Sequence, residues 1–269
     1  HCSSSMRNSL TSSTIGTSVT TFGWKVFFDC DSLTSVTIGN SVTTIGEYAF
    51  WACFELTSVT IGNSVTTIGN HAFYYCTSLT SVTIPDSVTT IEESAFDWCT
   101  SLASVTIGDS VTTIGDYAFY KCRSLTRVTS PDRVKTIGYE AFRDCNSLTS
   151  VTIGNSVTTI GDGAFSWCGS ITSVTIGDSV TTIGVDAFRS CDLTSVTIPD
   201  SVTTIGNGAF YNCYSLATVY CKPTTPPTGG RDMFYNNASG RKIYVPAGSA
   251  HAYKEKEYWS MYADYIFAE

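Results

Sequence analysis

One unit of 23 residues recurs along most of this 269-residue chain. Two consecutive copies read LTSVTIGNSVTTIGEYAFWACFE from Leu33 and LTSVTIGNSVTTIGNHAFYYCTS from Leu56. Every step between leading residues is 23, apart from one of 22. A fixed period of this length is typical of a solenoid, in which each unit is one coil and neighbouring coils share a core. The sequence contains nine full repeats, over residues 10–215.

The first half of each repeat predicts a strand, a turn and a second short strand. Val36 and Ile38 flank Thr37, and this alternation is typical of a β-strand with one buried face. The pair Gly39–Asn40, replaced by Pro–Asp in other copies, predicts a turn. The apolar residues at both ends of segment 42–45 then indicate a second extended segment.

The second half of each repeat predicts a short helix. Gly46 interrupts the strand pattern, and Ala49, Phe50 and Cys53 follow at the spacing i, i+1, i+4. This spacing suits one or two turns of α- or 3₁₀-helix over residues 47–53. The predicted fold is therefore an α/β repeat: a right-handed solenoid of about nine coils, each with a parallel strand, a turn, a short strand and a helical turn.

The two ends depart from the repeat. Residues 1–9 are expected to be disordered or frayed, and residues 216–269 to form a last strand and a C-terminal capping module, because a solenoid must cover its open core. Within that module we predict a strand over Lys242–Val245 and a helix over residues 249–257, with Ser249 as its N-cap.

The arrangement Cys-x-x-Leu-x-x-Val-x-Ile…Val-x-x-Ile…Ala-Phe, over residues 10–221, resembles the BspA-like (treponemal-type) leucine-rich repeats of microbial surface proteins. The tail from Lys242 is similar to the terminal module of many gut-bacterial members. Family members are implicated in adhesion and in binding host proteins or other microbes. The resemblance therefore implies a surface protein of a gut-type bacterium, at the cell surface or secreted, whose partners are extracellular host or microbial proteins or glycans.

Nine of the eleven cysteines recur at one place in the repeat. They are Cys30, Cys53, Cys76, Cys99, Cys122, Cys145, Cys168, Cys191 and Cys213. We expect a buried ladder of free thiols, because buried cysteine behaves as a small apolar residue. In this repeat class the ladder occupies the place of the asparagine ladder of other leucine-rich repeats. One or two disulfides, or a bound metal, are the alternatives; stacked side chains give a poor disulfide torsion, and no Cys-x-x-Cys occurs.

Charge and hydropathy exclude several partners. The net charge of -8 argues against nucleic acid or an anionic membrane surface as the main partner. No apolar run of about 18 residues occurs, so no transmembrane helix is predicted. Cys2, followed by three serines, makes a lipid anchor an alternative to secretion.

Variable positions within a constant frame supply the candidate binding residues. Aromatic residues concentrate there, and aromatic and arginine side chains are enriched at interface hot spots. The candidates are Tyr48, Trp51, Tyr74, Tyr75, Trp98, Tyr120, Trp167 and Tyr211. They form either a recognition strip along the predicted helical face or an apolar roof over the core.

A basic segment is the second candidate. Residues 31–120 contain no Lys or Arg, whereas residues 121–143 hold six of the fifteen basic residues. The candidates here are Arg127, Arg133, Lys135 and Arg143. This segment either docks an acidic glycan or protein segment, or is a solvated patch produced by drift in one repeat.

The sequence shows no catalytic motif. The three histidines lie far apart, and no nucleophile elbow, zinc-protease motif or phosphate-binding glycine loop occurs. A column of Asn or Asp after each turn glycine or proline is explained by turn chemistry, with Ca²⁺ as the alternative. We therefore expect no cofactor, no metal and no enzymatic activity. The predicted function is non-catalytic adhesion or binding through a repeat-built surface; the alternatives are a structural spacer scaffold and a glycan-binding protein that uses residues 121–143.

Overall fold

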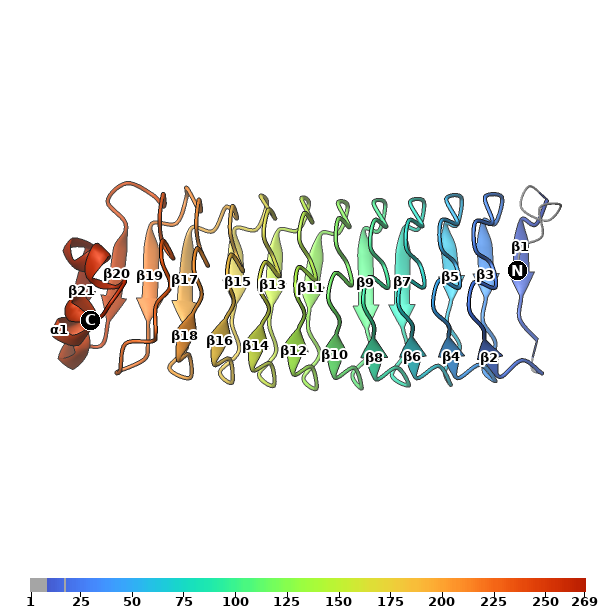
Figure 1. Cartoon of the computed structure of the whole chain (residues 1–269), viewed down its shortest axis with the longest axis horizontal. Coiled ribbons are helices and arrows are strands. Elements are labelled where there is room, and N and C mark those ends of the chain that lie inside the picture. The colour runs from blue at the N-terminus through green and yellow to red at the C-terminus, as the bar shows by residue number, and fades with distance from the viewer. Residues whose placement is uncertain (1–8, 17) are drawn as a thin grey trace.

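The computed structural model describes residues 9–16 and 18–269, and it is a rod of stacked coils (Figure 1). Each coil contributes a first strand, a second short strand and a run of tight turns to three sides of the rod. Eleven first strands follow one another, so the solenoid has about eleven turns rather than the nine predicted. The expectations for Cys2 and for disorder over residues 1–8 lie outside the described residues.

The first strands form one side of the rod. They are β1 (Ser12–Thr14), β3 (Ser35–Thr37), β5 (Ser58–Thr60), β7 (Ser81–Ile84), β9 (Ser104–Ile107), β11 (Arg127–Thr129), β13 (Ser150–Thr152), β15 (Ser173–Thr175), β17 (Ser195–Ile198), β19 (Thr218–Cys221) and β20 (Lys242–Val245). Neighbours that pair do so in parallel and in register, as Val36 with Val59. Identical positions therefore stack along the rod.

The second strands form a continuous nine-stranded parallel sheet on another side. They are β2 (Thr21–Phe22), β4 (Thr44–Ile45), β6 (Thr67–Ile68), β8 (Thr90–Ile91), β10 (Thr113–Ile114), β12 (Thr136–Ile137), β14 (Thr159–Ile160), β16 (Thr182–Ile183) and β18 (Thr204–Ile205). Each has only two residues, an outward threonine and an inward isoleucine or phenylalanine.

The pairing between successive first strands, unlike that between second strands, is interrupted where proline follows the later strand of a pair. β5 and β7 share a single register pair, and neither β9 and β11 nor β15 and β17 pair at all. The later strands of these three pairs are β7, β11 and β17, and they are followed by Pro85, Pro131 and Pro199. At the same place in a later coil, the Lys222 N–H donates to the oxygen of Ile198 at 3.0 Å. Proline has no N–H to donate at this position, and each place where pairing is lost or reduced coincides with one.

The predicted helical turn is wrong. Residues 46–53 and their equivalents form overlapping tight turns, and the described residues contain helices only near the C-terminus. Tyr48 and Ala52 adopt the left-handed conformation, with φ of 55° and 54°, and most other coils repeat this pair four residues apart. The N–H groups of Tyr48, Phe50 and Ala52 donate to oxygens of the next coil at 2.7–3.0 Å. A helix would turn these donors onto its own chain, whereas the alternating turns use them to join the coils. The fold is accordingly a parallel β-solenoid with minimal helix rather than an α/β repeat.

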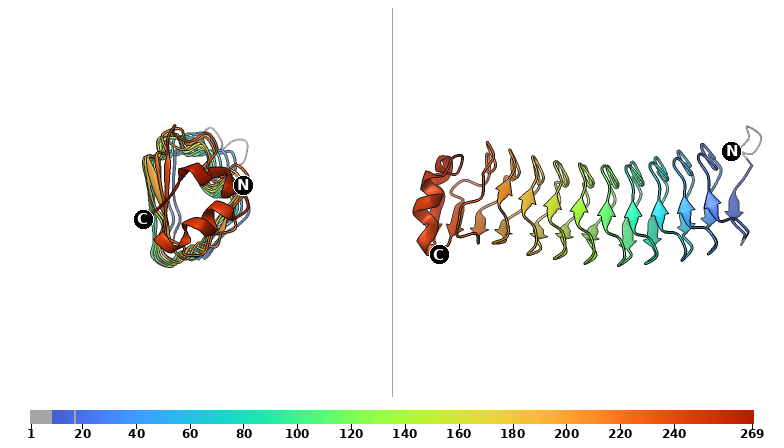
Figure 2. Two further views of the ribbon diagram at one scale, coloured as in Figure 1. Left: turned by 90° about the vertical axis from the view of Figure 1, so that its left-hand side faces the viewer. Right: turned by 60° about the horizontal axis from the view of Figure 1, so that its bottom comes forward.

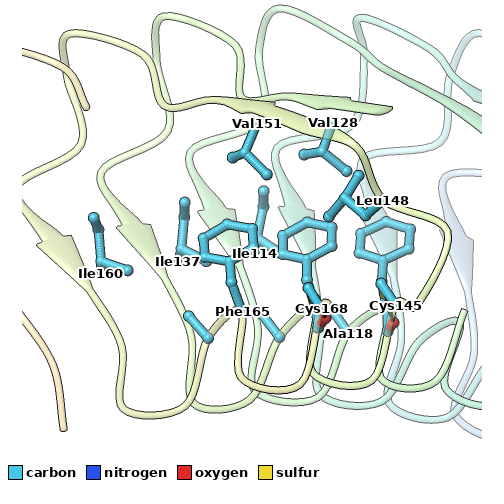
Figure 3. Packing of buried hydrophobic residues seen from close by; sticks show 14 of the residues in the cluster. Ile114, Ala118, Val128, Ile137, Cys145, Leu148, Val151, Ile160, Phe165 and Cys168 are labelled. Atoms are coloured by element: carbon cyan, nitrogen blue, oxygen red, sulfur yellow. Dashed lines mark hydrogen bonds between the residues drawn. The ribbon is translucent and has the colours of Figure 1, made fainter. Parts of the chain in front are cut away.

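The core is one continuous column of apolar side chains from all three sides. Figure 3 shows Val128 and Val151 from the first strands, Ile137 and Ile160 from the second strands, and Phe165 from the turns. These side chains are at most 3% exposed. The phenylalanines of successive coils stack with ring centroids 5.0–5.4 Å apart, from the Phe50–Phe73 pair to the Phe210–Phe234 pair.

The C-terminal module begins as two further turns of the same solenoid. Residues 230–237 repeat the turns of residues 206–213, and the predicted strand over Lys242–Val245 is confirmed as β20. The chain then forms η1 (Ala247–Ser249), α1 (Ala250–Glu255), η2 (Ser260–Tyr265) and β21 (Ile266–Ala268). These elements lie across the open end of the core (Figure 2).

Polar bonds fix this cap. The predicted helix is shorter than expected, and the Ser249 hydroxyl donates to the oxygen of Thr224 at 2.6 Å instead of capping α1. Trp259 is fully buried against Phe234, and its Nε1–H donates to the Pro227 oxygen at 2.8 Å. A large aromatic surface thus closes the core without burying an unpaired donor.

Candidate binding surfaces

The tight turns form one side of the rod, which we call the turn edge (residues 46–53 and their equivalents). In each coil an alanine and a phenylalanine point into the core, such as the fully buried Ala49 and Phe50. The side chains on either side of this pair, at the positions of Tyr48 and Trp51, therefore point outward. The two positions stack from coil to coil, so the turn edge carries two parallel columns of variable residues.

Most of the predicted aromatic residues are brought together in these columns and in a third one, at the position of Ala52, to which Tyr75 and Trp98 belong. Trp51 stacks on Phe28 at 5.9 Å and on Tyr74 at 4.2 Å between ring centroids. Tyr74 meets Tyr75 at 4.6 Å, and Tyr75 stacks on Trp98 at 5.1 Å. We call the residues from Phe28 to Trp98 in these contacts the aromatic strip. Tyr48 joins it through Trp51, at 5.2 Å.

Beyond Trp98 the strip continues through a cation. The ammonium of Lys121 lies 4.1 Å from the ring centroid of Trp98 and 4.9 Å from that of Tyr120. Cation–π contacts of this kind hold a lysine side chain flat against the rings. Trp167 and Tyr211 lie further along the turn edge, on either side of Arg189, whose guanidinium carbon is 5.9 Å and 4.8 Å from their centroids.

One carboxyl group interrupts the strip. Asp97 takes the place that Tyr74 and Tyr120 hold in the coils before and after it, and it is only 7% exposed. Its Oδ1 is buried without a hydrogen-bond partner. Burial raises the pKa of Asp97 to about 7, although Lys121 and Ser94 act in the opposite direction. Burial likewise raises the pKa of Tyr74 to about 12.

The basic residues of segment 121–143 are distributed over different sides of the rod. Arg127 lies in β11, whereas Lys135 directly precedes β12 on the second-strand side. Arg133 lies in the loop between those strands, and Arg143 lies on the turn edge, where its Nη1 pairs with Glu140 Oε1 at 2.5 Å. The four candidates do not converge on one basic surface.

Arg127 lines a groove on the first-strand side. The missing pairing between β9 and β11 leaves a hollow of about 300 Å³, which Pro131, Asp109 and Thr106 also line. The smaller joint between β5 and β7 opens a similar hollow next to Pro85. Both hollows therefore lie where pairing is lost or reduced, next to a proline.

The cysteines form a hydrogen-bonded ladder. Each thiol donates to the backbone oxygen of the phenylalanine-bearing turn of the coil before it, at 3.0–3.2 Å, as Cys122 does to Phe96. The members with free, buried thiols are Cys53, Cys76, Cys99, Cys122, Cys145, Cys168, Cys191 and Cys213. Cys30, at the start of the column, is fully buried but disulfide-bonded, which differs from the free thiol expected there. Burial raises the pKa of Cys53 and Cys213 to about 12.

Several contributors were not found from the sequence. Phe28 and Tyr235 extend the aromatic stacks at their two ends, and Tyr235 lies 5.2 Å from Tyr211. The signal for Tyr235 was present, because Phe234–Tyr235 repeats Phe210–Tyr211 after a step of 24 residues. The burial of Asp97 leaves no such signal, since it depends on rings from neighbouring coils.

The described residues show no arrangement that would hold a metal: within 9–16 and 18–269, no three His, Cys, Asp or Glu side chains come together for that purpose. The Asn and Asp column serves the turns, as Asn40 Oδ1 accepts from the Asn63 N–H at 2.9 Å.

The longest helix has six residues, and in the part of the chain that the structure describes none could cross a lipid bilayer.

Comparison with known proteins agrees with this architecture. The chain matches the model of the BspA type leucine rich repeat region in six copies, over residues 4–99, 66–192 and 181–256. A leucine-rich repeat protein from Bacteroides ovatus is 31% identical, with a TM-score of 0.73; the match covers 84% of this chain and 59% of that one. This chain thus spans less than two thirds of the Bacteroides protein's length.

A second solved structure supports the fold alone. A leucine-rich repeat protein from Eubacterium ventriosum is 22% identical, with a TM-score of 0.52, and the match covers 87% of this chain and 84% of that one. Among curated proteins, none matches the chain. The family match extends over most of the solenoid, and the chain belongs to the BspA-type leucine-rich repeat family.

Proposed function

We propose that this chain is a non-catalytic binding protein of a microbial surface, or a secreted one, that holds host or microbial macromolecules against its turn edge. Family membership supports a binding role and an extracellular location. The observation that carries the proposal is the aromatic strip, in which half-buried rings from four consecutive coils touch one another. Preassembled aromatic surface binds at low entropic cost, because its rings are already fixed.

The charge around the strip supports one class of partner over another. Lysines lie against the two ends of the strip, Lys25 on Phe28 and Lys121 on Trp98. Between them, residues 31–120 contain nine Asp and Glu and no Lys or Arg, so most of the strip lies in an acidic part of the rod. A partner with apolar and basic side chains would meet complementary charge, whereas an acidic partner would be repelled. Each coil would contribute a modest contact, and several contacts along the rod would add up to useful avidity.

The repeats themselves supply suitable test substitutions. Serine occurs at the position of Trp51 and Tyr74 in another coil, as Ser166, so Trp51→Ser with Tyr74→Ser introduces residues compatible with the fold. We expect this double variant to lose at least tenfold in affinity for immobilised extracellular-matrix proteins that the parent chain binds. The matched control is Thr83→Ser with Thr106→Ser, which changes two exposed residues of β7 and β9 and should leave binding unchanged.

A second pair of variants separates recognition from folding. Trp51→Phe with Tyr74→Phe keeps the stacked surface, as Phe28 does in the first coil, and should retain binding. Circular dichroism should show the same spectrum for all variants. Unchanged binding by the folded serine variant would contradict the proposal. If the serine variant loses the folded spectrum, loss of its binding reports unfolding, and the rings would then serve as a cover for the core rather than as the binding surface.

A further inference from the structure

A hollow of about 250 Å³ opens on the turn edge, beyond the aromatic strip. It spans three consecutive coils and exists because the middle coil has small residues at both outward positions. Ser166 stands where Tyr74 and Tyr120 stand in other coils, and Gly163 where Tyr117 does. A Cβ added at Gly163 would lie only 3.0 Å from Cγ of Glu140, so this glycine lets the Glu140 side chain fold over it.

Two equivalent ion pairs form opposite walls of this hollow, which we call the turn-edge pocket. On one side Arg143 Nη1 pairs with Glu140 Oε1 at 2.5 Å, and on the other Arg189 Nη1 pairs with Asp186 Oδ2 at 3.3 Å. Both arginine side chains are about one-third exposed, at 34% and 36%. The Nε atoms of both arginines are buried and make no hydrogen bond, and that of Arg143 lies 3.7 Å from Asp144 Oδ2. A guanidinium group carries five N–H donors, so each ion pair, made through Nη1, holds its planar group in place and leaves further donors on a side chain that is about one-third exposed.

Aromatic rings stand at the rim. Trp167 is 45% exposed and Tyr139 is 42% exposed, and both line the pocket. The pocket therefore combines flat apolar surface with carboxylate acceptors and guanidinium donors. A sugar ring offers the complement, with an apolar C–H face on one side and hydroxyl groups, each a donor and an acceptor, around its edge.

The charge balance selects among sugars. Three carboxylates line the pocket, those of Glu140, Asp162 and Asp186, against two guanidinium groups. Both guanidinium groups are already neutralised by their own partners, so an acidic sugar would find no free positive charge. Neutral hydroxyl groups, in contrast, can donate to the carboxylates and accept from the arginines without a desolvated net charge.

We propose that the turn-edge pocket binds one unit of a neutral glycan, with the sugar stacked on Trp167 and its hydroxyl groups held by the two ion pairs. This site lies outside the aromatic strip, so the proposal goes beyond the proposed function and does not depend on it.

The first test fills the pocket with a residue that the chain already uses. Ser166→Tyr places tyrosine at the position of Tyr74, Tyr120 and Tyr211, where the solenoid accommodates it. The protein is screened on an array of neutral, sialylated and sulfated glycans, and the best neutral hit is then titrated as its methyl glycoside. We expect Ser166→Tyr to weaken this binding at least tenfold. The matched control, Asp97→Tyr, introduces tyrosine at the repeat position of Ser166 but three coils earlier, and it should leave the affinity for the methyl glycoside unchanged.

A second variant tests the stacking ring. Trp167→Asn introduces the residue found at the same place in Asn212, and we expect at least a tenfold loss of affinity for the methyl glycoside. Binding of sialylated or sulfated glycans alone would overturn the proposal. Binding of basic peptides in place of glycans, or equal affinity of the parent and Ser166→Tyr proteins for the methyl glycoside, would overturn it as well. So would the absence of any neutral glycan hit. The Trp51/Tyr74 serine variant should keep its sugar binding, which separates this site from the proposed function.

Discussion

The side-chain amide of Asn237 donates a hydrogen bond of 2.7 Å to the backbone oxygen of Phe210. One coil earlier, the thiol of Cys213 serves the equivalent oxygen, that of Phe188, at 3.1 Å. The last coil thus uses asparagine where the preceding eight use cysteine. The cysteine column is therefore a hydrogen-bonding ladder as well as apolar filling, because each thiol is a second donor to a carbonyl that already accepts an N–H in its own coil, as the Phe188 oxygen does from Cys191 at 3.3 Å.

This role predicts different costs for two substitutions at one ladder position. Cys122→Ala removes the donor to the Phe96 oxygen and leaves a small cavity, and we expect a loss of about 1–3 kcal/mol in the free energy of unfolding. Cys122→Ser keeps a hydroxyl donor and should lose less. The measurement is the urea midpoint followed by circular dichroism, with the exposed Ser104→Ala as control. Equal midpoints for the alanine and serine variants would show that the thiol acts only by filling space.

The same burial predicts inert thiols in the native state. Nine described cysteines, from Cys53 to Cys221, are free and buried, and burial raises the pKa of Cys53 to about 12. At pH 8 such a thiol is protonated and out of reach of reagents. We expect Ellman's reagent to modify none of these nine in the native protein and all nine in guanidinium chloride. Rapid modification of the native protein would contradict the buried ladder.

Asp97 predicts that stability depends on pH in an unusual direction. Its pKa is about 7 in the folded chain, against 3.8 for an unperturbed carboxyl group, because burial disfavours the charged form. The folded state therefore binds more protons than the unfolded state between these values. The contribution of Asp97 to the free energy of unfolding is therefore greatest below pH 4 and falls as the pH rises towards 7. The total decrease is at most about 4 kcal/mol.

Asp97→Asn isolates this effect, because the amide does not titrate. We expect the unfolding midpoint of the variant, minus that of the parent chain, to increase between pH 4.5 and pH 8. Other titrating groups are common to both proteins and cancel in the difference. A difference that stays constant over this range would mean that Asp97 titrates in the folded protein as it does in water.

Replacing Pro131, which follows β11, should protect the backbone N–H groups near this strand from hydrogen exchange. Pro131→Gly restores an N–H at the place where Lys222 bonds to Ile198, and we expect β9 and β11 to pair. Hydrogen exchange followed by mass spectrometry should then slow in the peptide that spans β11. Overall stability should change by no more than about 1 kcal/mol, because glycine also loosens the unfolded chain. Pro131→Ala restores the N–H with a side chain and should show the same slowing; exchange that stays fast in both variants would exclude proline as the cause of the gap.

Much of the fold could be predicted from the sequence because the determinants repeat at a fixed spacing. The period of 23 residues and the alternation around Val36, Thr37 and Ile38 required stacked parallel strands, and the structure pairs them in register. The inward positions of Leu33 and Phe50 were evident for the same reason, since an apolar column along the rod needs the same residue at the same place. The strands after Leu216 and at Lys242–Val245 were predicted, but the latter was assigned to the cap rather than to a further coil, because Gly240 replaces the leading leucine and the step lengthens to 24 residues.

What the tertiary structure decided lies between the coils. The turn edge is not helical, because the N–H groups of Tyr48 and Phe50 find their acceptors 22 residues ahead, in the next coil, rather than in their own turn. The aromatic strip and the turn-edge pocket have the same origin. Whether Trp51 stacks on Tyr74, or Ser166 leaves a space between Arg143 and Arg189, depends on side chains brought within a few ångströms by stacking. The sequence determined the coil, and contacts between successive coils determined the surface.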